Sequence, residues 1–473
     1  MSIKNLLDPI IEQGIRNTNF FEGRLLSGED LRNQHNANRQ HDRYLGQAIG
    51  QGIINGLEVE LDNGRDGSDG EPPVVTVKKG LAINAEGEAI GLPGDDIKLA
   101  LSRSIEKPTL ELADFYACAG PPDKQHIPNG AGVYILVMSP VAGFKERALK
   151  SGLGDGGVAS GCGSKYIQEG VEFRLVEVAV DDFKFLSEDT RDLLKNNLLS
   201  KNDPVLKNNL ERLSMLRNII AHAFFGTEKA GNYYNTSNDV ISECFSVDKL
   251  SSCDVPVCVL YWTLGGVAFV DMWSVRRKLN SHYICGSGNE IESYLRLKNS
   301  ESMLFQFQDH LDMLSINRAS MGGVEAKKYF RYLPPAGIVP LSYKLTTGYN
   351  PAMFFKSIPH RDTPGFSNSW YEFRKENPQF IDGDNMVTIF SSAINYPPID
   401  LNNNKMVWLY FIWQQIKNLE SGSENIMSIV FTNSSMKDHS VSRFDVSRWD
   451  YSNFSSVNLT SNSGKLIGGW DNG

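Results

Sequence analysis

The sequence lacks any long apolar run. Its apolar segments fall far short of the roughly 20 consecutive residues that a membrane-spanning helix needs, so we expect no transmembrane segment. The first residues, MSIKNLLDPIIEQGIRN, contain short apolar pairs that Asp8, Pro9 and Glu12 interrupt. A secretory signal needs a continuous apolar core and a small-residue cleavage site. We therefore expect synthesis in the cytoplasm without a signal peptide.

Cysteine is scarce and positive charge is not in excess. Six cysteines in 473 residues are too few for a disulfide framework, so in a reducing compartment we expect free thiols at Cys118, Cys162, Cys244, Cys253, Cys258 and Cys285. The formal net charge is −9. A dedicated nucleic-acid-binding protein usually carries a basic domain or stripe, so we expect no nucleic-acid partner.

Local signatures of catalysis and of metal binding are also missing. The sequence contains no HExxH and no GxSxG, and no GxGxxG opens a helix after a strand. The loop Asp62–Pro73 has Gly64 and Pro73 where an EF-hand needs oxygen ligands. The Gly-rich loop at 152–165 lacks the P-loop spacing, and Cys253 and Cys258 are too far apart for a CxxC zinc pair. We therefore predict no enzyme activity, no catalytic residues, no metal and no cofactor.

The N-terminal residues 1–105 show a helix followed by short strands. Ser27 is a good helix N-cap, Glu29 and Asp30 suit the first turn, and glycines at 50, 52 and 56 close the helix. Apolar alternation at 57–61, 74–84, 88–92 and 97–101 predicts antiparallel hairpins with a turn around Ala85–Gly87.

The remaining chain divides into a central region, 106–323, and a C-terminal domain, 324–473. Strands are predicted at 133–140, 171–180 and 255–273, the last a hairpin that turns near Gly265. Helices are predicted from Asp203–Pro204 to Gly226 and over 300–317. Beyond Gly323, MVTIFSSAI, KMVWLYFIWQQI and NIMSIVFTN indicate a mainly β domain. The expected fold class is α+β, predominantly antiparallel β with several helices.

The stretch NQHNANRQHDR, 33–43, places polar residues on a helix where an apolar face is expected. His35 and His41 are six positions apart, about 120° around the axis, so they cannot chelate one metal from that helix. Three interpretations of this stretch remain open: a surface that contacts a partner subunit, a buried hydrogen-bond network within the chain, and a metal or catalytic site. The stripe that raises the question consists of Leu31, His35, Asn38, Asp42, Leu45 and Ile49.

Aromatic side chains gather beside small polar residues in the C-terminal domain. SNSWYEF contains Trp370 and Tyr371, and SRWDYSNF contains Trp449 and Tyr451. Such clusters stack on sugar rings or anchor protein interfaces, and they also pack the core of β domains. They make a target-cell surface glycan a possible ligand.

The N-terminal block resembles a family of structural proteins, baseplate- or fibre-associated, of phage tails and phage-tail-like contractile injection systems. The resemblance lies in NFFEGRLLSGEDLRNQHNANRQHDRYLGQAIGQGIINGLEVEL and VTVKKGLAINAEGEAI, with DVPVCVLYWTLGGVAFVDMWSVRR and YFRYLPPAGIVPL further along. Lys79–Gly80 stands where the family commonly has Pro–Gly, and Asn84 where it has Asp. These landmarks cover about the first 340 residues.

The resemblance implies a non-enzymatic structural component, at the baseplate or its periphery, that docks through its N-terminal region. Its partners would be other baseplate, spike, sheath or fibre subunits, with copies of the chain forming a homo-oligomer inside a particle that is released from the cell. We expect an interface formed by Phe20, Phe21, Leu25, Leu26, His35, Asn38, Arg39 and Asp42. The alternatives are a tail fibre or glycan-binding protein that uses the aromatic C-terminal domain, and a hydrolase of cell-surface polymers.

Overall fold

A computed structural model describes the chain in segments that include most of the first 341 residues and parts of the remainder. The described residues are 15–62, 64–68, 72–101, 116–117, 132–149, 162–198, 209–229, 241, 244–246, 249–263, 265–279, 290–316, 322–334, 336–341, 349–358, 360–361, 380–382, 398–402, 407–415, 426–433 and 467–468. Helices and mainly antiparallel sheets alternate along them, which confirms the α+β class.

The N-terminal part forms one long helix and two small sheets. The helix α1, Gly28–Ile49, begins at the Ser27 N-cap and ends at Gly50, as predicted. The strands β1 (Gly52–Gly56), β4 (Gly80–Ile83) and β5 (Ala89–Leu92) form one three-stranded sheet. The strands β2 (Val59–Leu61), β3 (Val74–Val77) and β6 (Ile97–Ala100) form the other. All pairings in both sheets are antiparallel.

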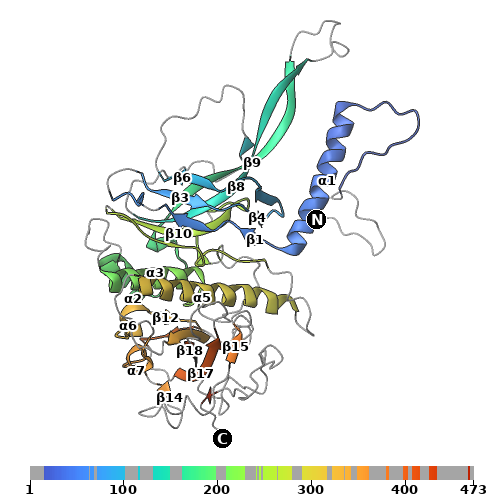
Figure 1. Cartoon of the computed structure of the whole chain (residues 1–473). Coiled ribbons are helices and arrows are strands. Elements are labelled where there is room, and N and C mark those ends of the chain that lie inside the picture. Colours follow the sequence, from blue (N-terminus) through green and yellow to red (C-terminus); the bar gives the residue numbers. More distant parts are fainter. Residues whose placement is uncertain are drawn as a thin grey trace.

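A larger antiparallel sheet forms the middle of the molecule. Its order is β11 (Gly266–Asp271), β10 (Val255–Thr263), β8 (Gly132–Leu149) and β7 (Tyr116–Ala117), with β9 (Cys162–Val178) on the other side of β8. The predicted hairpin at 255–273 is confirmed. The predicted pair at 133–140 and 171–180 is also present, but both strands run much further and make a long ribbon that projects from the body (Figure 1).

Helices cover one face of this sheet. The first are η1, a 3₁₀ turn at Val180–Asp182, and α2, Glu188–Asp192, which continues into the π-helical η2, Leu193–Leu198. The longer α3, Leu210–Phe224, and α5, Glu290–Ile316, lie side by side beneath the sheet (Figure 1). The predicted start of α3 at Asp203–Pro204 is wrong, because Asn209 caps the helix by accepting a bond from the Arg212 amide.

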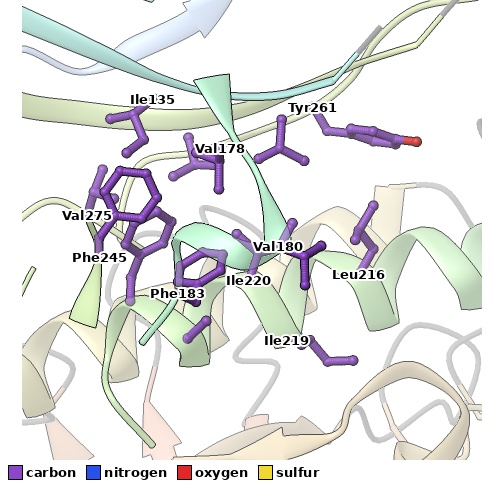
Figure 2. Packing of buried hydrophobic residues seen from close by; sticks show 14 of the residues in the cluster. Ile135, Val178, Val180, Phe183, Leu216, Ile219, Ile220, Phe245, Tyr261 and Val275 are labelled. Atoms are coloured by element: carbon purple, nitrogen blue, oxygen red, sulfur yellow. The ribbon is translucent and has the colours of Figure 1, made fainter. Parts of the chain in front are cut away.

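Period-two alternation lets the central sheet build two cores. Ile135, Val178 and Tyr261 point toward Leu216 and Ile220 of α3 (Figure 2). The intervening residues of the same strands, such as Leu136 and Leu260, pack on the other side against the two small sheets. Burying one such side chain stabilises the fold by roughly 1.5–3 kcal/mol, so these two cores fix the small sheets and the helices to opposite faces.

The C-terminal part adds short helices, a two-stranded sheet and a six-stranded sheet. The helices are α6 (Ala326–Tyr329) and α7 (Pro351–Phe354). The strands are β12 (Tyr332–Leu333), β13 (Ala336–Leu341), β14 (His360–Arg361), β15 (Phe380–Asp382), β16 (Ile399–Asp400), β17 (Val407–Gln415), β18 (Ile426–Asn433) and β19 (Ile467–Gly468). The predicted strands at 405–416 and 425–433 are therefore confirmed, and MVTIFSSAI lies outside the described residues. One core cluster joins Phe307 and Leu314 of α5 to Tyr329 and Phe354 beyond Gly323.

Within the segments described above, no helix combines the length and the apolar character that crossing a membrane requires.

Candidate interaction surface

The segment before α1 is folded back on the first turns of that helix. The Thr18 amide donates to Gln34 Oε1 at 3.2 Å, and its hydroxyl donates to the Asp30 carbonyl at 2.9 Å. Arg24 pairs with Asp30, which also completes a capping box with Ser27. The Ser27 hydroxyl accepts from the Asp30 amide, one of the groups that a helix N-terminus otherwise leaves open. Together these contacts give residues 18–30 a defined shape without burying their apolar side chains.

The large apolar side chains of this region face solvent. Leu25 is 94% exposed and Phe21 is 62% exposed, and Phe20 and Leu26 are likewise exposed. Further along, α1 exposes Leu31, Tyr44, Leu45 and Ile49. Exposed apolar surface on a folded protein can mark an interaction site, so these side chains are candidates for one. We call these eight side chains the α1 apolar surface.

The polar stripe of α1 lies on the outside of the molecule. His35, Asn38 and Asp42 are exposed, together with Leu31, Leu45 and Ile49 of the same stripe. This contradicts the reading of a buried hydrogen-bond network within the chain. Among the described residues, no cluster of three or more metal-ligating side chains is present, here or elsewhere.

Among the described residues, the polar contacts between α1 and the body lie in the C-terminal half of the helix. Arg39 and Arg43 both pair with Glu88, at 2.9 Å and 2.5 Å, and the Gln47 amide donates to the Glu86 carbonyl. Partial burial raises the pKa of Glu88, but the bonds and charges of Arg43 and Arg39 outweigh it and leave that pKa below its ordinary value. Arg39, predicted to contact another subunit, thus already has a partner in its own chain.

The backbones of α1 and of the turn before β5 also approach each other closely. A Cβ on Gly46 would lie 2.0 Å from the Gly87 carbonyl oxygen, a distance that no side chain tolerates. Gly87 itself has a φ of +82°, in the turn between β4 and β5 that the sequence predicted. The helix therefore rests on this turn, while its N-terminal half and the preceding segment extend away from the body (Figure 1).

A buried charge network lies between α3, β11 and α5. Arg217 donates through Nε to Asp271 at 2.6 Å and also pairs with Asp309. Asp271 accepts three further bonds, from the amide and hydroxyl of Ser274 and from Gln306. Burial raises the pKa of Asp271, but Arg217 and these bonds outweigh it and hold the pKa below its ordinary value. This network joins three elements.

Ser214 and His310 form a second buried pair, at 2.6 Å between Oγ and Nε2. The Ser214 hydroxyl donates to the Tyr329 carbonyl at 3.0 Å, so its oxygen accepts from the imidazole. A nucleophilic serine needs the opposite arrangement, in which the hydroxyl donates to a histidine base. Both side chains are fully buried, so this pair joins α3 to α5 and to α6.

His222 lies in the last turn of α3, where a protonated side chain would interact favourably with the helix dipole. The side chain is buried, and burial lowers its pKa to about 3, which leaves the imidazole neutral. It contacts the Thr227 hydroxyl at 2.8 Å and the Tyr332 ring instead.

The cysteine prediction also needs correction. Cys244 and Cys258 are free and buried, as expected, but Cys253 is disulfide-bonded. The expectation followed from the cellular compartment alone, and such an argument contains no information about which cysteines the fold brings together. Cys118 and Cys285 lie outside the described residues.

A shallow groove of about 920 Å³ crosses the two small sheets, lined by residues that include Glu58, Glu60, Lys78 and Asp96. Lys78 lies 3.4 Å from Glu60 and 3.7 Å from Asp96, so charges along the groove pair with each other. The candidate ligand surface of Trp370, Tyr371, Trp449 and Tyr451 lies outside the described residues.

The α1 apolar surface is therefore the feature of the described structure that most clearly needs a partner. No protein-family model matches the chain, and no curated protein matches its sequence.

Proposed function

We propose that this protein is a non-enzymatic structural subunit of a contractile injection system or phage-tail-like particle, at the baseplate or its periphery. The observation that carries the proposal is the α1 apolar surface, presented on an element that is tied to the body at one end only. The partners would be neighbouring baseplate, spike, sheath or fibre subunits, assembled in the cytoplasm into a particle that is released later.

The chemistry of the surface supports docking onto protein. Phe20, Phe21 and Leu25 are large apolar anchors, and burying each would contribute roughly 1.5–3 kcal/mol. Aromatic anchors commonly carry most of the binding energy of an interface. The exposed His35, Asn38 and Asp42 would add hydrogen bonds that set orientation and register rather than affinity.

The attachment of α1 supports the same proposal. Two arginines on one glutamate and a glycine contact set the direction in which the helix leaves the body. A helix presented in this way can enter a groove on a neighbour without rearranging the cores. The buried groups with catalytic potential, Ser214 and His310, are engaged in holding helices together.

The test is incorporation into particles. The double variant Phe20→Ala, Phe21→Ala would be expressed in place of the native chain, and purified particles would be assayed by electron microscopy and by quantitative mass spectrometry of this subunit. We expect incorporation to fall strongly, because the anchors are lost while the body is untouched.

Ile316→Ala is the matched control, since Ile316 is 82% exposed at the end of α5 and outside the α1 apolar surface. It should enter particles normally. Normal incorporation of the Phe20, Phe21 variant would remove the docking assignment.

A further inference from the structure

The strand β9 is a long edge strand. On one side of β8, the strands β10 and β7 pair with residues 132–138 and 141–142. On the other side, β9 pairs with β8 in one register from Val133↔Val178 to Leu149↔Cys162. The ladder misses only the pair at Glu146, whose φ is +61°. Within the segments that the structure describes, β9 pairs with no strand except β8. Among the described strands, none pairs with its outer row of amide and carbonyl groups, so this edge is a candidate to receive another strand.

The distal part of this edge is solvated and partly apolar. Residues 165–170, KYIQEG, are all exposed, and Ile167 is 68% exposed. Here β8 and β9 form a two-stranded ribbon beyond the sheet (Figure 1). Ribbons of two strands are marginal by themselves, and open edges with apolar side chains readily add a further strand. This ribbon contains neither a proline nor a bulge near Ile167 that would prevent such pairing.

The sequence of the edge complements itself in the antiparallel direction. When two copies meet about a twofold axis at Ile167, Ile167 faces its own copy, and Lys165 faces Glu169 of the other chain twice. Tyr166 then faces Gln168, on the other face of the ribbon. Moving the axis to Gln168 would place Ile167 opposite Glu169 and remove both charge pairs.

We propose that two copies of this chain pair through β9, antiparallel, about an axis at Ile167. The interface is isologous, which is the commonest arrangement in soluble oligomers. Lys165 already contacts Glu146 of its own chain at 3.3 Å, and its ammonium group has further donors for Glu169 of the second copy. The inference is independent of the docking role of α1, because no residue of α1 takes part.

A charge exchange tests the pairing. Sedimentation velocity of the full chain should show a concentration-dependent species with twice the 52.7 kDa monomer mass. Glu169→Lys would oppose Lys165 twice, and we expect the dissociation constant to rise on the order of tenfold. Glu169→Lys leaves the Lys165–Glu146 contact intact, so the effect concerns the second copy. In a Glu146→Gln background, which removes the like-charge contact that Lys165→Glu would make inside each chain, the double variant Lys165→Glu, Glu169→Lys should restore association.

Lys145→Glu provides a control on the same ribbon. Lys145 is exposed and lies opposite Tyr166, so it is on the face away from Lys165 and Glu169. Its change should leave the dissociation constant within about twofold, since surface charges at other positions contribute little. A chain that stays monomeric at every concentration, or a double variant that fails to recover, would overturn the proposal.

Crosslinking tests the position of the axis. Ile167→Cys places two thiols face to face across the axis and should give a covalent dimer under mild oxidation. Tyr166→Cys should crosslink much less, because that residue faces Gln168. Equal crosslinking of both variants would contradict the register. The Phe20→Ala, Phe21→Ala variant should dimerise normally, which separates this inference from the proposed function.

Discussion

Asp271 holds three elements together through one carboxylate. It joins β11 to α3 through Arg217 and to α5 through Gln306, and it is fully buried. Asp271→Asn keeps the shape but leaves the buried Arg217 cation with only Asp309. Breaking a buried pair in this way typically costs about 3–5 kcal/mol. Urea denaturation should show a loss of that size in the free energy of unfolding, whereas Asp309→Asn should cost less because the Asp309 side chain is 38% exposed. Equal effects would show that Asp271 is not the centre of the network.

His222 makes stability depend on acidity. Burial lowers its pKa to about 3, whereas the unfolded chain has an ordinary value near 6.5. Between these values the unfolded state binds a proton that the folded state does not. The stability that the neutral His222 contributes is therefore fully present above pH 6.5. The free energy of unfolding falls as the pH drops toward 3, by about 1.4 kcal/mol per pH unit for this group. Burial also lowers the pKa of His310, which adds to the same slope.

The variant His222→Gln should reduce the pH dependence of the free energy of unfolding by the amount that corresponds to one bound proton. Urea denaturation at a series of acidic pH values measures the slope, and Asn38→Ala, which changes no titratable group on the exposed stripe of α1, is the control that should leave it unchanged. An unaltered slope in the His222 variant would mean that this imidazole is protonated in the folded protein.

At the scale of elements, the seating of α1 depends on the contact between Gly46 and Gly87. Gly46→Ala would place a methyl group 2.0 Å from the Gly87 carbonyl oxygen. Overpacking of this kind destabilises a contact by roughly 1–3 kcal/mol. We expect faster amide hydrogen exchange in residues 43–49 and 84–88 with little change in the central sheet. Gly28→Ala is the control, because its Cβ would meet nothing within 4 Å. Unchanged exchange in the Gly46 variant would show that α1 shifts to accommodate the methyl group without weakening its contact with the turn.

Elements with local signals were predictable, and those set by distant partners were not. Ser27 capping α1, the hairpin at 255–273 and the apolar face of Met303, Phe307 and Leu311 are encoded in neighbouring residues. The distal ribbon of β8 and β9 has little apolar alternation, and backbone pairing between residues far apart extends it. The start of α3 was misplaced because Pro204 favours a helix start as strongly as the actual cap, Asn209.

The same distinction applies to the candidate site. Phe20 and Phe21 were predicted to be docking residues from a resemblance to a family motif. The structure shows that both side chains are exposed, and their docking role stays a prediction. The contact of Arg39 and Arg43 with Glu88 was not predicted, because the partners are 45 or more residues apart. Ion pairs between residues far apart in the chain produce no periodic pattern in the sequence.

At the scale of the whole molecule, α1 and its preceding segment are separable from the rest. None of the large core clusters among the described residues includes a side chain of residues 15–49. Among the described residues, the links to the body are partly exposed ion pairs, worth about 0–1 kcal/mol each, the Gln47–Glu86 hydrogen bond and the Gly46 contact. A chain that begins at Gln51 should therefore unfold within about 3 °C of the full chain.

The truncated chain should also lose an apolar surface. The fluorescence of a dye that binds exposed apolar groups should fall, since Phe20, Phe21, Leu25 and Leu26 are removed. Full-length Leu25→Ser, Leu45→Ser is the control that keeps α1 but lowers the dye signal in part. A large drop in unfolding temperature on truncation would instead make α1 part of the cooperative core. Its exposed leucines would then need a structural explanation rather than a partner.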